Sequence, residues 1–564
     1  MHNVLFVLLR RIRRPLILLI VVYAISVLGF VLIPGVDDKG QPWHMGFFHA
    51  FYVVSYTATT IGFGELPYLF TNAQRLWSIL VIYASVLTWL YSIGALFAAL
   101  QDQGFRSLMV RYAFQRDVAR IGEPFYLICG YGDTGTLLTR ALAESDIRSV
   151  VLDINQECIN ALKLEDLPLH VPGWCADASL PDALTVAGLT HSNCIGIVAL
   201  TNSDDVNLRI AITARLLHPH LITVCRAESL EAEKNMIAFG TDHIINPFDT
   251  FAARLAMALH SPGMYLLYEW MTVTPTEALR EPIFPPHGHW ILCGYGRFGK
   301  AVHERLTAEG IAVTVIEADH ARTAPPPGSV QGRGSEPEVL RQAGIETAAG
   351  IVAGTDNDAT NLSVALTART LNPNLFMVAR QNQHQNEATF RAANLQLVMQ
   401  RALVIAHKIF ALITTPLLPE FLQLARTQGN DWANVLVARI GGIVGEVAPY
   451  TWIIEVNDVT TPAIITALQG GRKVCVGDLY LDPRNRADRL PCLALLLMRG
   501  NEPALLPLDE HSLAVGDRIL MCGLVEASEH INLTLHNHNA LNYVLTGIDR
   551  PAGFLWDWLM RQRD

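Results

Sequence analysis

The sequence predicts a protein of mixed class: a membrane α-helical domain with two spanning helices and a short helix between them, followed by cytoplasmic α/β units of the Rossmann type. Three observations lead to this prediction. Two long apolar runs, residues 15–34 and 76–100, contain no charged residue. A glycine-rich segment lies between those runs. Further along the chain, the pattern Gly-x-Gly-x-x-Gly occurs twice, each time between an apolar stretch and a helical one.

The two apolar runs have the length of membrane spans. At about 1.5 Å per residue in a helix, each crosses a hydrocarbon layer of about 30 Å. Basic residues flank the pair on its outer sides: Arg10, Arg11, Arg13 and Arg14 precede it, and Arg106, Arg111, Arg116 and Arg120 follow it. Since such charge stays on the cytoplasmic side, both termini are expected in the cytoplasm and the protein in the inner (plasma) membrane. The alternative, a cleaved signal peptide, leaves the second run unexplained and needs a small-residue cleavage site that the sequence lacks.

The segment between the spans has the features of a re-entrant cation path. Residues 43–58 are too short to cross and predict a helix whose C-terminal end directs partial negative charge toward a cation. The next residues read Thr-Thr-Ile-Gly-Phe-Gly-Glu, and alternating glycines permit a backbone that lines a pore with carbonyl oxygens. The candidate K+-binding residues are Thr59, Thr60, Ile61, Gly62, Phe63 and Gly64.

This segment resembles the Thr-Val-Gly-Tyr-Gly-Asp selectivity filter of potassium channels. Ile61 stands for Val, Phe63 for Tyr and Glu65 for Asp. Phe63 lacks the hydroxyl group that can anchor the filter to its surroundings, so a poorly selective cation channel stays open as an alternative. The simpler interpretation of the segment is an ordinary glycine-rich turn.

An internal repeat occupies much of the remaining chain. Each copy reads apolar strand, Gly-x-Gly-x-x-Gly, amphipathic helix (137–144 and 301–309), and a strand that ends in an acid, Asp153 or Glu317. In a dinucleotide-binding unit the first glycine permits the turn, the second lets a pyrophosphate approach, the third packs helix on strand, and the acid accepts hydrogen bonds from ribose. The sequence therefore predicts two candidate nucleotide sites.

Residues beyond the glycines extend these sites. The candidate nucleotide-binding residues are Gly130, Gly132, Asp133, Thr134, Gly135, Asp153, Thr201 and Asn202 in the first copy, and Gly294, Gly296, Arg297, Phe298, Gly299, Glu317, Thr355 and Asp356 in the second. Capping of the following helix explains the Thr201 and Thr355 pairs almost as well. Arg297 either reaches a phosphate or is a solvated loop residue. Ala301 stands where a magnesium-binding Ser or Thr is required, which excludes a nucleotide-hydrolysing P-loop.

Composition limits the remaining possibilities. The chain has 564 residues, a net charge of −10, and its basic residues gather near the apolar runs, which argues against a nucleic-acid partner. The nine cysteines form no Cys-x-x-Cys pair and are interpreted as reduced, mostly buried residues. A membrane-anchored NAD-dependent oxidoreductase would use the Rossmann units, but no acid/base grouping accompanies them. The pair His287 and His289 is a weak candidate for a metal site.

Filter, two spans and tandem Rossmann units together resemble the prokaryotic two-span potassium channels with RCK (KTN/TrkA-N, TrkA-C) domains. The resemblance implies a ligand-gated channel, not an enzyme. It implies a homotetramer with eight RCK units in a gating ring, embedded in a lipid bilayer, with no obligate protein partner. The implied ligands are K+ as permeant ion and NAD or another adenine nucleotide (ADP or ATP), and the resemblance also allows Ca2+ as a ligand.

On this resemblance the chain divides into eight segments. These are the pore domain 1–100, a linker 101–124, the first RCK N-lobe 125–260, an inter-RCK linker 261–288, the second N-lobe 289–400, crossover helices 401–435, a C-lobe of strands 436–525 and a tail 526–564 without assigned structure. The short inter-RCK linker implies that the first copy lacks its own C-lobe. The linker arginines are interpreted as facing lipid headgroups.

The gate is sought in the second apolar run. Related channels often carry a hinge glycine nearer the filter, whereas the available glycine here is Gly94. The helix either bends at or below Gly94, or stays straight and closes by crowding of apolar side chains. The candidate gate residues are Gly94, Leu96, Phe97 and Leu100; simple contact with lipid is the alternative for each.

Overall fold

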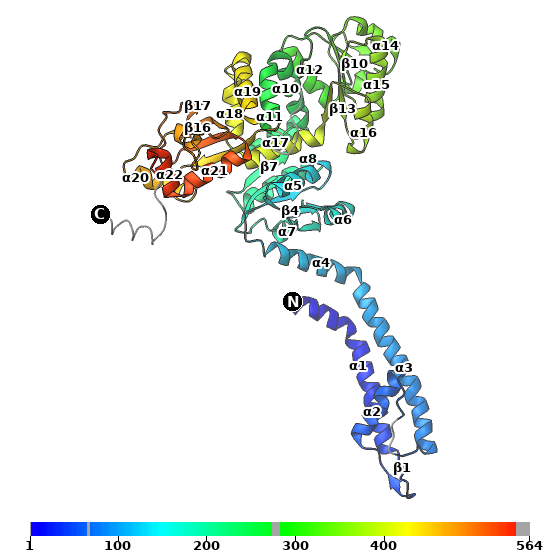
Figure 1. Cartoon of the computed structure of the whole chain (residues 1–564). Coiled ribbons are helices and arrows are strands. Elements are labelled where there is room, and N and C mark those ends of the chain that lie inside the picture. The colour runs from blue at the N-terminus through cyan, green and yellow to red at the C-terminus, as the bar shows by residue number, and fades with distance from the viewer. Residues whose placement is uncertain (1, 65–67, 273–282, 549–564) are drawn as a thin grey trace, which may run out of the picture. The chain divides into compact units, whose positions relative to one another are not determined.

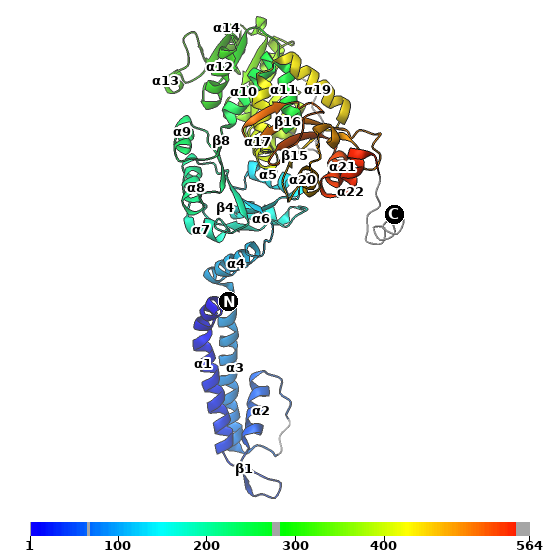
Figure 2. The same cartoon turned by 90° about the vertical axis from the view of Figure 1, so that its left-hand side faces the viewer.

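The computed structural model describes residues 2–64, 68–272 and 283–548, and it divides into two compact units, Met1–Arg120 and Ile121–Asp564 (Figure 1, Figure 2). Each unit is described separately below. Glu65 lies outside the described residues, so its predicted place in the filter is not addressed by the structure.

The N-terminal unit is a pair of long helices with a re-entrant loop. Its elements are α1 (His2–Leu32), β1 (Gly35–Val36), β2 (Pro42–Trp43), α2 (Phe47–Ala58), α3 (Asn72–Gln101) and α4 (Gln103–Val118). Helices α1 and α3 lie side by side (Figure 1, Figure 2). Ile12–Leu32 and Asn72–Gln101 are long and apolar enough to cross a membrane, with mean hydropathies of 2.8 and 1.9. Exposed leucines and isoleucines along both helices, such as Leu28 and Leu87, give them a surface suited to lipid.

The predicted start of the re-entrant helix is wrong. Trp43 belongs to the short antiparallel β1–β2 ribbon, and α2 begins at Phe47, because Gly46 adopts an extended conformation (ψ 153°) before the first helical turn. The linker predicted at 101–124 is largely helical. Helix α3 ends at Gln101, because the backbone of Asp102 is extended. The Asp102 side chain caps α4 by accepting a hydrogen bond from the Phe105 N–H (3.0 Å).

The C-terminal unit contains two six-stranded parallel sheets of the same topology. The first has the order β5-β4-β3-β6-β7-β8 and the second β11-β10-β9-β12-β13-β14. The first comprises β3 (Phe125–Cys129), α5 (Asp133–Glu144), β4 (Arg148–Asp153), α6 (Gln156–Leu164), β5 (Gly173–Cys175), α7 (Pro181–Val186), β6 (Cys194–Ala199), α8 (Asp204–Leu217), β7 (Ile222–Arg226), α9 (Leu230–Ala238) and β8 (His243–Ile245). The second comprises β9 (Trp290–Cys293), α12 (Arg297–Ala308), β10 (Val313–Glu317), α13 (His320–Thr323), β11 (Val330–Gln331), α14 (Pro337–Gln342), β12 (Gly350–Ala353), α15 (Asp358–Leu371), β13 (Phe376–Gln381), α16 (Glu387–Ala392) and β14 (Leu397–Gln400).

This strand order is that of a doubly wound Rossmann sheet. The order reverses between β3 and β6 in the first unit and between β9 and β12 in the second. A crevice opens at such a reversal, outside the carboxyl ends of the strands, and both glycine loops begin there. The repeat predicted from the sequence is therefore a repeat of structure, and it places each loop where this fold binds ligands.

The two Rossmann units exchange helices. Helix α10 (Pro247–His260) follows the first sheet but packs on α12 of the second unit, where Phe248, Phe251 and Leu255 join the core around Phe298. Helix α17 (Arg401–Thr414) follows the second sheet but packs on α5 of the first unit. The exchange joins the two units through apolar cores, so their ligand-binding edges are held near one another.

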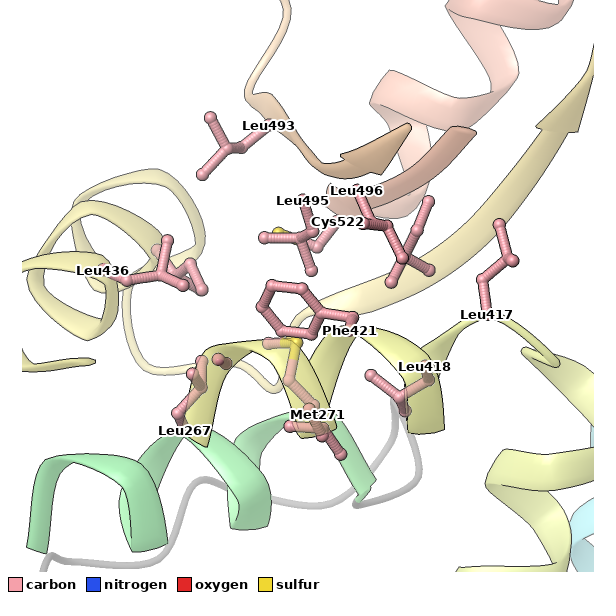
Figure 3. Packing of buried hydrophobic residues seen from close by; sticks show 14 of the residues in the cluster. Leu267, Met271, Leu417, Leu418, Phe421, Leu436, Leu493, Leu495, Leu496 and Cys522 are labelled. Atoms are coloured by element: carbon pink, nitrogen blue, oxygen red, sulfur yellow. The ribbon is translucent and has the colours of Figure 1, made fainter. Parts of the chain in front are cut away.

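A third subdomain follows the second Rossmann unit. It contains α11 (Pro262–Thr272), α18 (Leu418–Arg426), α19 (Asn430–Val444), α20 (Pro462–Gln469) and an antiparallel sheet of order β15-β18-β16-β17. The strands are β15 (Tyr450–Glu455), β16 (Cys492–Arg499), β17 (Glu502–Leu505) and β18 (Arg518–Gly523). Figure 3 shows Leu267 and Met271 of α11 packed with Phe421, Leu495 and neighbouring side chains, so α11, which follows the first repeat, is buried in the subdomain that follows the second.

The interpretation of residue 436 onward as strands is wrong at its start. Leu436, Val437, Ile440 and Val444 are buried on one face of α19, a helical spacing, and the first strand begins at Tyr450. The tail, whose structure was not predicted, contributes α21 (Val525–His536) and α22 (His538–Thr546). These helices pack against the β-sheet core through residues such as Ile531 and Leu541, so the subdomain extends well past residue 525.

One further expectation concerns the cysteines. All nine cysteines are free and six are buried, which confirms their interpretation as reduced apolar residues. Burial raises the pKa of the Cys293 thiol to about 12, so this thiol stays protonated. The bent helix pair α17–α18 is also apolar enough for a membrane, but its side chains are buried in cores of the C-terminal unit.

Candidate functional sites

The first candidate site is the loop after α2 in the N-terminal unit. Thr59 ends the helix, and the N–H groups of Ile61 and Gly62 donate to the Tyr56 carbonyl (3.0 and 3.3 Å), which turns the chain back along the helix end. Positive φ angles occur at alternate residues, Thr60 (61°), Gly62 (65°) and Gly64 (72°). Alternation of the sign of φ turns successive peptide groups to the same side, so carbonyl oxygens form a row. The loop thus has the backbone that a cation path requires.

The candidate gate lies within α3. The helix runs unbroken from Asn72 to Gln101 and contains Gly94. Leu96, Phe97 and Leu100 follow on its last turns and are 39%, 58% and 42% exposed in the single chain. Among the described residues, the helical backbone after Gly94 is first interrupted at Asp102, which is extended and follows the end of α3. A bend at Asp102 was not among the residues proposed from the sequence.

The two glycine loops have the same geometry. Gly130 and Gly294 have positive φ angles of 108° and 97°, which L residues rarely adopt. A Cβ on Gly135 would lie 2.1 Å from the Gly130 carbonyl oxygen, so the third glycine is required by close packing of helix on strand. A Cβ on Gly132 would meet nothing within 4 Å, which leaves the second glycine facing open space.

Each acid at the end of the second strand contacts the glycine loop. Asp153 accepts hydrogen bonds from the Tyr131 N–H (2.6 Å) and the Asn155 N–H (2.7 Å). Glu317 accepts equivalent bonds from Tyr295 (2.6 Å) and Asp319 (2.9 Å). A carboxylate offers about four acceptor positions, so capacity for ribose hydroxyls remains.

The first residues of the two following helices differ in character. Asp133 is the first residue of α5 and Arg297 the first residue of α12, so the repeat places opposite charges at the same position. Thr134 is buried beside the first loop. Phe298 is fully buried between Phe248 and Phe251, so its ring is part of the core and only its backbone can contact a ligand.

The polar pairs at the ends of β6 and β12 are fixed by asparagines that the sequence analysis did not propose. The Thr201 N–H and hydroxyl donate to Asn207 Oδ1 (3.0 and 2.7 Å), and Asn207 Nδ2 donates to the Arg226 carbonyl (2.9 Å). Asn361 repeats this arrangement around Thr355 in the second unit. The helix caps are Ser203 and Asn357, so the alternative that Thr201 and Thr355 cap the next helix is wrong.

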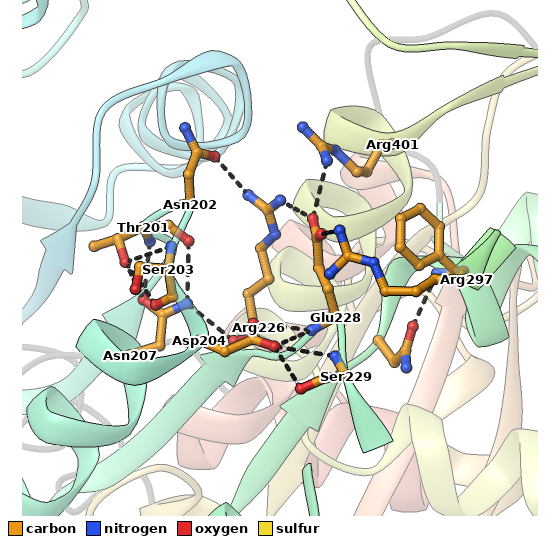
Figure 4. A network of polar contacts seen from close by, with 12 residues as sticks. Thr201, Asn202, Ser203, Asp204, Asn207, Arg226, Glu228, Ser229, Arg297 and Arg401 are labelled. Atoms are coloured by element: carbon orange, nitrogen blue, oxygen red, sulfur yellow. Dashed lines mark hydrogen bonds and ion pairs between the residues drawn. The ribbon is translucent and has the colours of Figure 1, made fainter. Parts of the chain in front are cut away.

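One glutamate forms ion pairs with three arginines where the Rossmann units meet (Figure 4). Glu228 lies two residues past the end of β7. It pairs with Arg226 at the end of that strand, with Arg297 (2.9 Å) from the second glycine loop and with Arg401 (2.9 Å) from the start of α17. Burial alone would raise the pKa of Glu228, and the three guanidinium groups lower it below its ordinary value. Arg297 is therefore not a freely solvated loop residue.

Metal ligands do not gather in the described residues. In that part of the chain, no group of three or more His, Cys, Asp or Glu side chains could hold a metal ion. His289 contacts the Thr314 hydroxyl through Nε2 (2.8 Å), and burial lowers its pKa. The His287–His289 pair thus has no third ligand among these residues.

These features define the class: a membrane domain with a pore loop, joined to paired Rossmann-type nucleotide domains. Comparison with known families agrees. Residues 17–102 match the ion channel family, and residues 126–247 and 290–400 match the TrkA-N domain. The predicted resemblance to two-span channels with tandem RCK domains is confirmed: the chain contains one ion channel domain and two TrkA-N domains, and it is a membrane protein.

Individual relatives agree with this assignment. Probable potassium channel protein 2 of Methanocaldococcus jannaschii is 26% identical over 39% of this chain and 62% of the relative. Potassium channel protein 1 of the same organism is 25% identical over 39% of this chain and 64% of the relative. The chain thus spans less than two thirds of the length of these two relatives. Among solved structures, the GsuK channel bound to NAD covers 94% of this chain and 99% of its own, with 16% identity and a TM-score of 0.46.

Proposed function

We propose that the protein is a potassium-selective channel whose opening is controlled by adenine nucleotides bound to its Rossmann units. The observation that carries this proposal is the loop after α2, where φ is positive at Thr60, Gly62 and Gly64 in alternation. Such a backbone offers rows of carbonyl oxygens that replace the hydration shell of a monovalent cation. The relatives named as potassium channels support K+ as the ion.

The pore requires several copies of the chain. Residues Thr60 to Gly64 are exposed in the single chain, and so are aromatic side chains of α2, with Phe47 71% and Phe48 76% exposed. A ring of carbonyls around an ion needs the same loop from other subunits, and packing of subunits would cover these aromatic side chains. We therefore propose a homotetramer with eight Rossmann units, in the inner membrane with both termini in the cytoplasm.

The nucleotide ligands are assigned from the loops. Both loops keep the three glycines and the acid in register, so both are proposed to bind adenine nucleotides, NAD in the first and NAD, ADP or ATP in the second. We propose Ca2+ as a ligand only where assembly of the subunits brings acidic side chains together. Nucleotide binding serves gating here and not turnover, because the family match is to ion channels.

A flux assay on the purified protein in liposomes tests the proposal. Liposomes loaded with K+ should release it through the protein at a rate that changes when NAD is added to the outside, while Na+-loaded liposomes should release little with or without NAD. Gly62→Ala is the matched pore variant, which should lose flux while keeping nucleotide binding. Equal flux of K+ and Na+ would instead support the poorly selective cation channel, the alternative that Phe63 raises. Absence of any flux in either ion would refute the channel proposal.

A further inference from the structure

Four arginine side chains converge between the Rossmann units, with one carboxylate in direct contact. Arg226, Arg297 and Arg401 each pair with Glu228, whose side chain is 9% exposed (Figure 4). The fourth, Arg380, is the last residue but one of β13, and it matches Arg226 at the end of β7 in the first Rossmann unit. The cluster therefore contains more positive charge than its central carboxylate neutralises.

Arg380 shows the consequence of this imbalance. Its guanidinium group lies over the rings of Phe248 (5.0 Å) and Phe298 (5.7 Å), and its Nε is buried without a hydrogen-bond partner among the described residues. Burial, and next the proximity of Arg401, lowers the pKa of Arg380 to about 10. Glu228 and Asp356 act on Arg380 in the opposite direction without neutralising it. A protonated, partly buried guanidinium in this state is stabilised by an added anion.

The cluster lies at the phosphate end of the second glycine loop. Arg297 is the first residue of α12, where backbone N–H groups and the helix dipole favour phosphate, and its guanidinium group lies over the same Phe248 ring as that of Arg380 (5.7 Å). Glu228 comes from the other Rossmann unit, and it reaches Arg297 because α10 is exchanged onto α12. The side chain best placed to meet a nucleotide phosphate is thus already paired with a carboxylate.

We propose that Glu228 occupies the place of a phosphate group, and that a nucleotide entering the second loop replaces it on Arg297 and gains Arg380 as a further contact. This inference rests on the proposed nucleotide regulation and specifies its second site. The ligand class is an adenine nucleotide with a charged terminal phosphate, ADP or ATP, because each added charge competes better with the carboxylate. Asp133 occupies the equivalent position in the first loop and disfavours such ligands there, which leaves that site to NAD.

Replacement of Glu228 couples the two units. The carboxylate released from Arg297 stays next to Arg226 and Arg401, at the end of β7 and the start of α17. Binding at the second site thereby changes an ion-pair network that reaches the first unit. Glu228 is a residue that sets specificity, and Arg297 and Arg380 are ligand contacts.

Calorimetry on the full-length protein in detergent tests the proposal. A Gly132→Ala background weakens the first site, so that titrations with adenosine, AMP, ADP and ATP report chiefly on the second. In that background Glu228→Gln should tighten ADP and ATP binding by about tenfold, the size of one charge-assisted contact, and leave adenosine unchanged. Glu231→Gln, an exposed carboxylate on the neighbouring helix α9, is the control and should change neither.

Other results overturn the proposal. An equal shift for adenosine and ADP, or an ADP affinity that stays constant or falls in a folded Glu228→Gln protein, excludes competition by the carboxylate. If Glu228→Gln does not fold, Arg297→Gln decides: a loss of ADP affinity of about tenfold supports the proposal, and an unchanged affinity refutes it. A wild-type second site that binds no adenine nucleotide also refutes it, while K+ flux from liposomes tests conduction separately.

Discussion

Alanine at the second and third glycine of the first loop should give opposite phenotypes. Gly132 has φ −82° and ψ −163°, angles that alanine adopts, and its Cβ would meet nothing within 4 Å. Gly132→Ala should therefore keep or raise the free energy of unfolding, by up to about 1 kcal/mol, because alanine restricts the unfolded chain. The new methyl group occupies the space that a pyrophosphate needs. Loss of one charge-assisted hydrogen bond to backbone N–H costs about 1.5–3 kcal/mol, so NAD affinity should fall by about 10- to 100-fold.

Gly135→Ala should act through the fold. Its Cβ would lie 2.1 Å from the Gly130 carbonyl oxygen and 3.0 Å from the carbonyl carbon, a backbone contact that no rotamer change relieves. A cost of about 1–3 kcal/mol is expected for such overpacking. Calorimetric NAD titration and thermal unfolding of the full-length protein measure both effects. Gly296→Ala, with φ −73° and ψ −165°, is the matched variant in the second unit and separates the two sites.

If Gly132→Ala and Gly296→Ala both bind NAD with wild-type affinity, the second glycine of the loops does not serve the approach of a pyrophosphate. That role is also refuted if Gly132→Ala unfolds as readily as Gly135→Ala, because the second glycine would then serve packing instead of ligand approach.

Four further predictions concern other parts of the chain. Gly62→Ala forces alanine into a left-handed conformation at about 1–2 kcal/mol and should abolish K+-selective current in bilayer recordings; a retained selective current would contradict the filter assignment. Asp153→Ala should weaken the NAD response of the current and leave the reversal potential unchanged; an unaltered response would exclude the first site. Asp102→Ala removes the cap of α4, at about 1 kcal/mol, and should weaken the same response, whereas an unaltered response would exclude Asp102 as a coupling point. Because the folded-state pKa of Glu228 is lowered, its stabilisation is present above its ordinary pKa and is lost as pH falls through the folded value; when the pH is lowered from about 5 to about 3, Glu228→Gln should therefore lose less thermal stability than wild type, and parallel curves would contradict this.

The glycine loops could be predicted because their function is encoded locally. Gly130 and Gly294 need positive φ, and Gly135 and Gly299 need the absence of a Cβ, so spacing alone identifies them. The spans followed from uninterrupted apolar runs for the same reason. The sequence predicted strands at residues 436–444 because a short apolar run fits both the alternation of a strand and the periodicity of a helix. These residues form a helix because helical spacing buries one face of the segment against the β-sheet.

The Glu228 network could not be predicted from local sequence. Arg401 is 173 residues from Glu228, and the two meet because α17 and α10 are exchanged between the Rossmann units. The roles of Asn207 and Asn361 could not be predicted either, because each links the ends of two strands that the fold brings together. The sequence alone could have drawn attention to Arg297, because the equivalent position in the first copy of the repeat is Asp133, which has the opposite charge.

A K+-selective pore under nucleotide control should be visible in a single electrical recording. The purified protein is placed in a planar bilayer under opposed K+ and Na+ gradients, and NAD is added to the side that the cytoplasmic unit faces. The account predicts a reversal potential near the potassium equilibrium potential and an open probability that changes with NAD. A reversal potential near zero, or a current that ignores NAD, ADP and ATP alike, would contradict it.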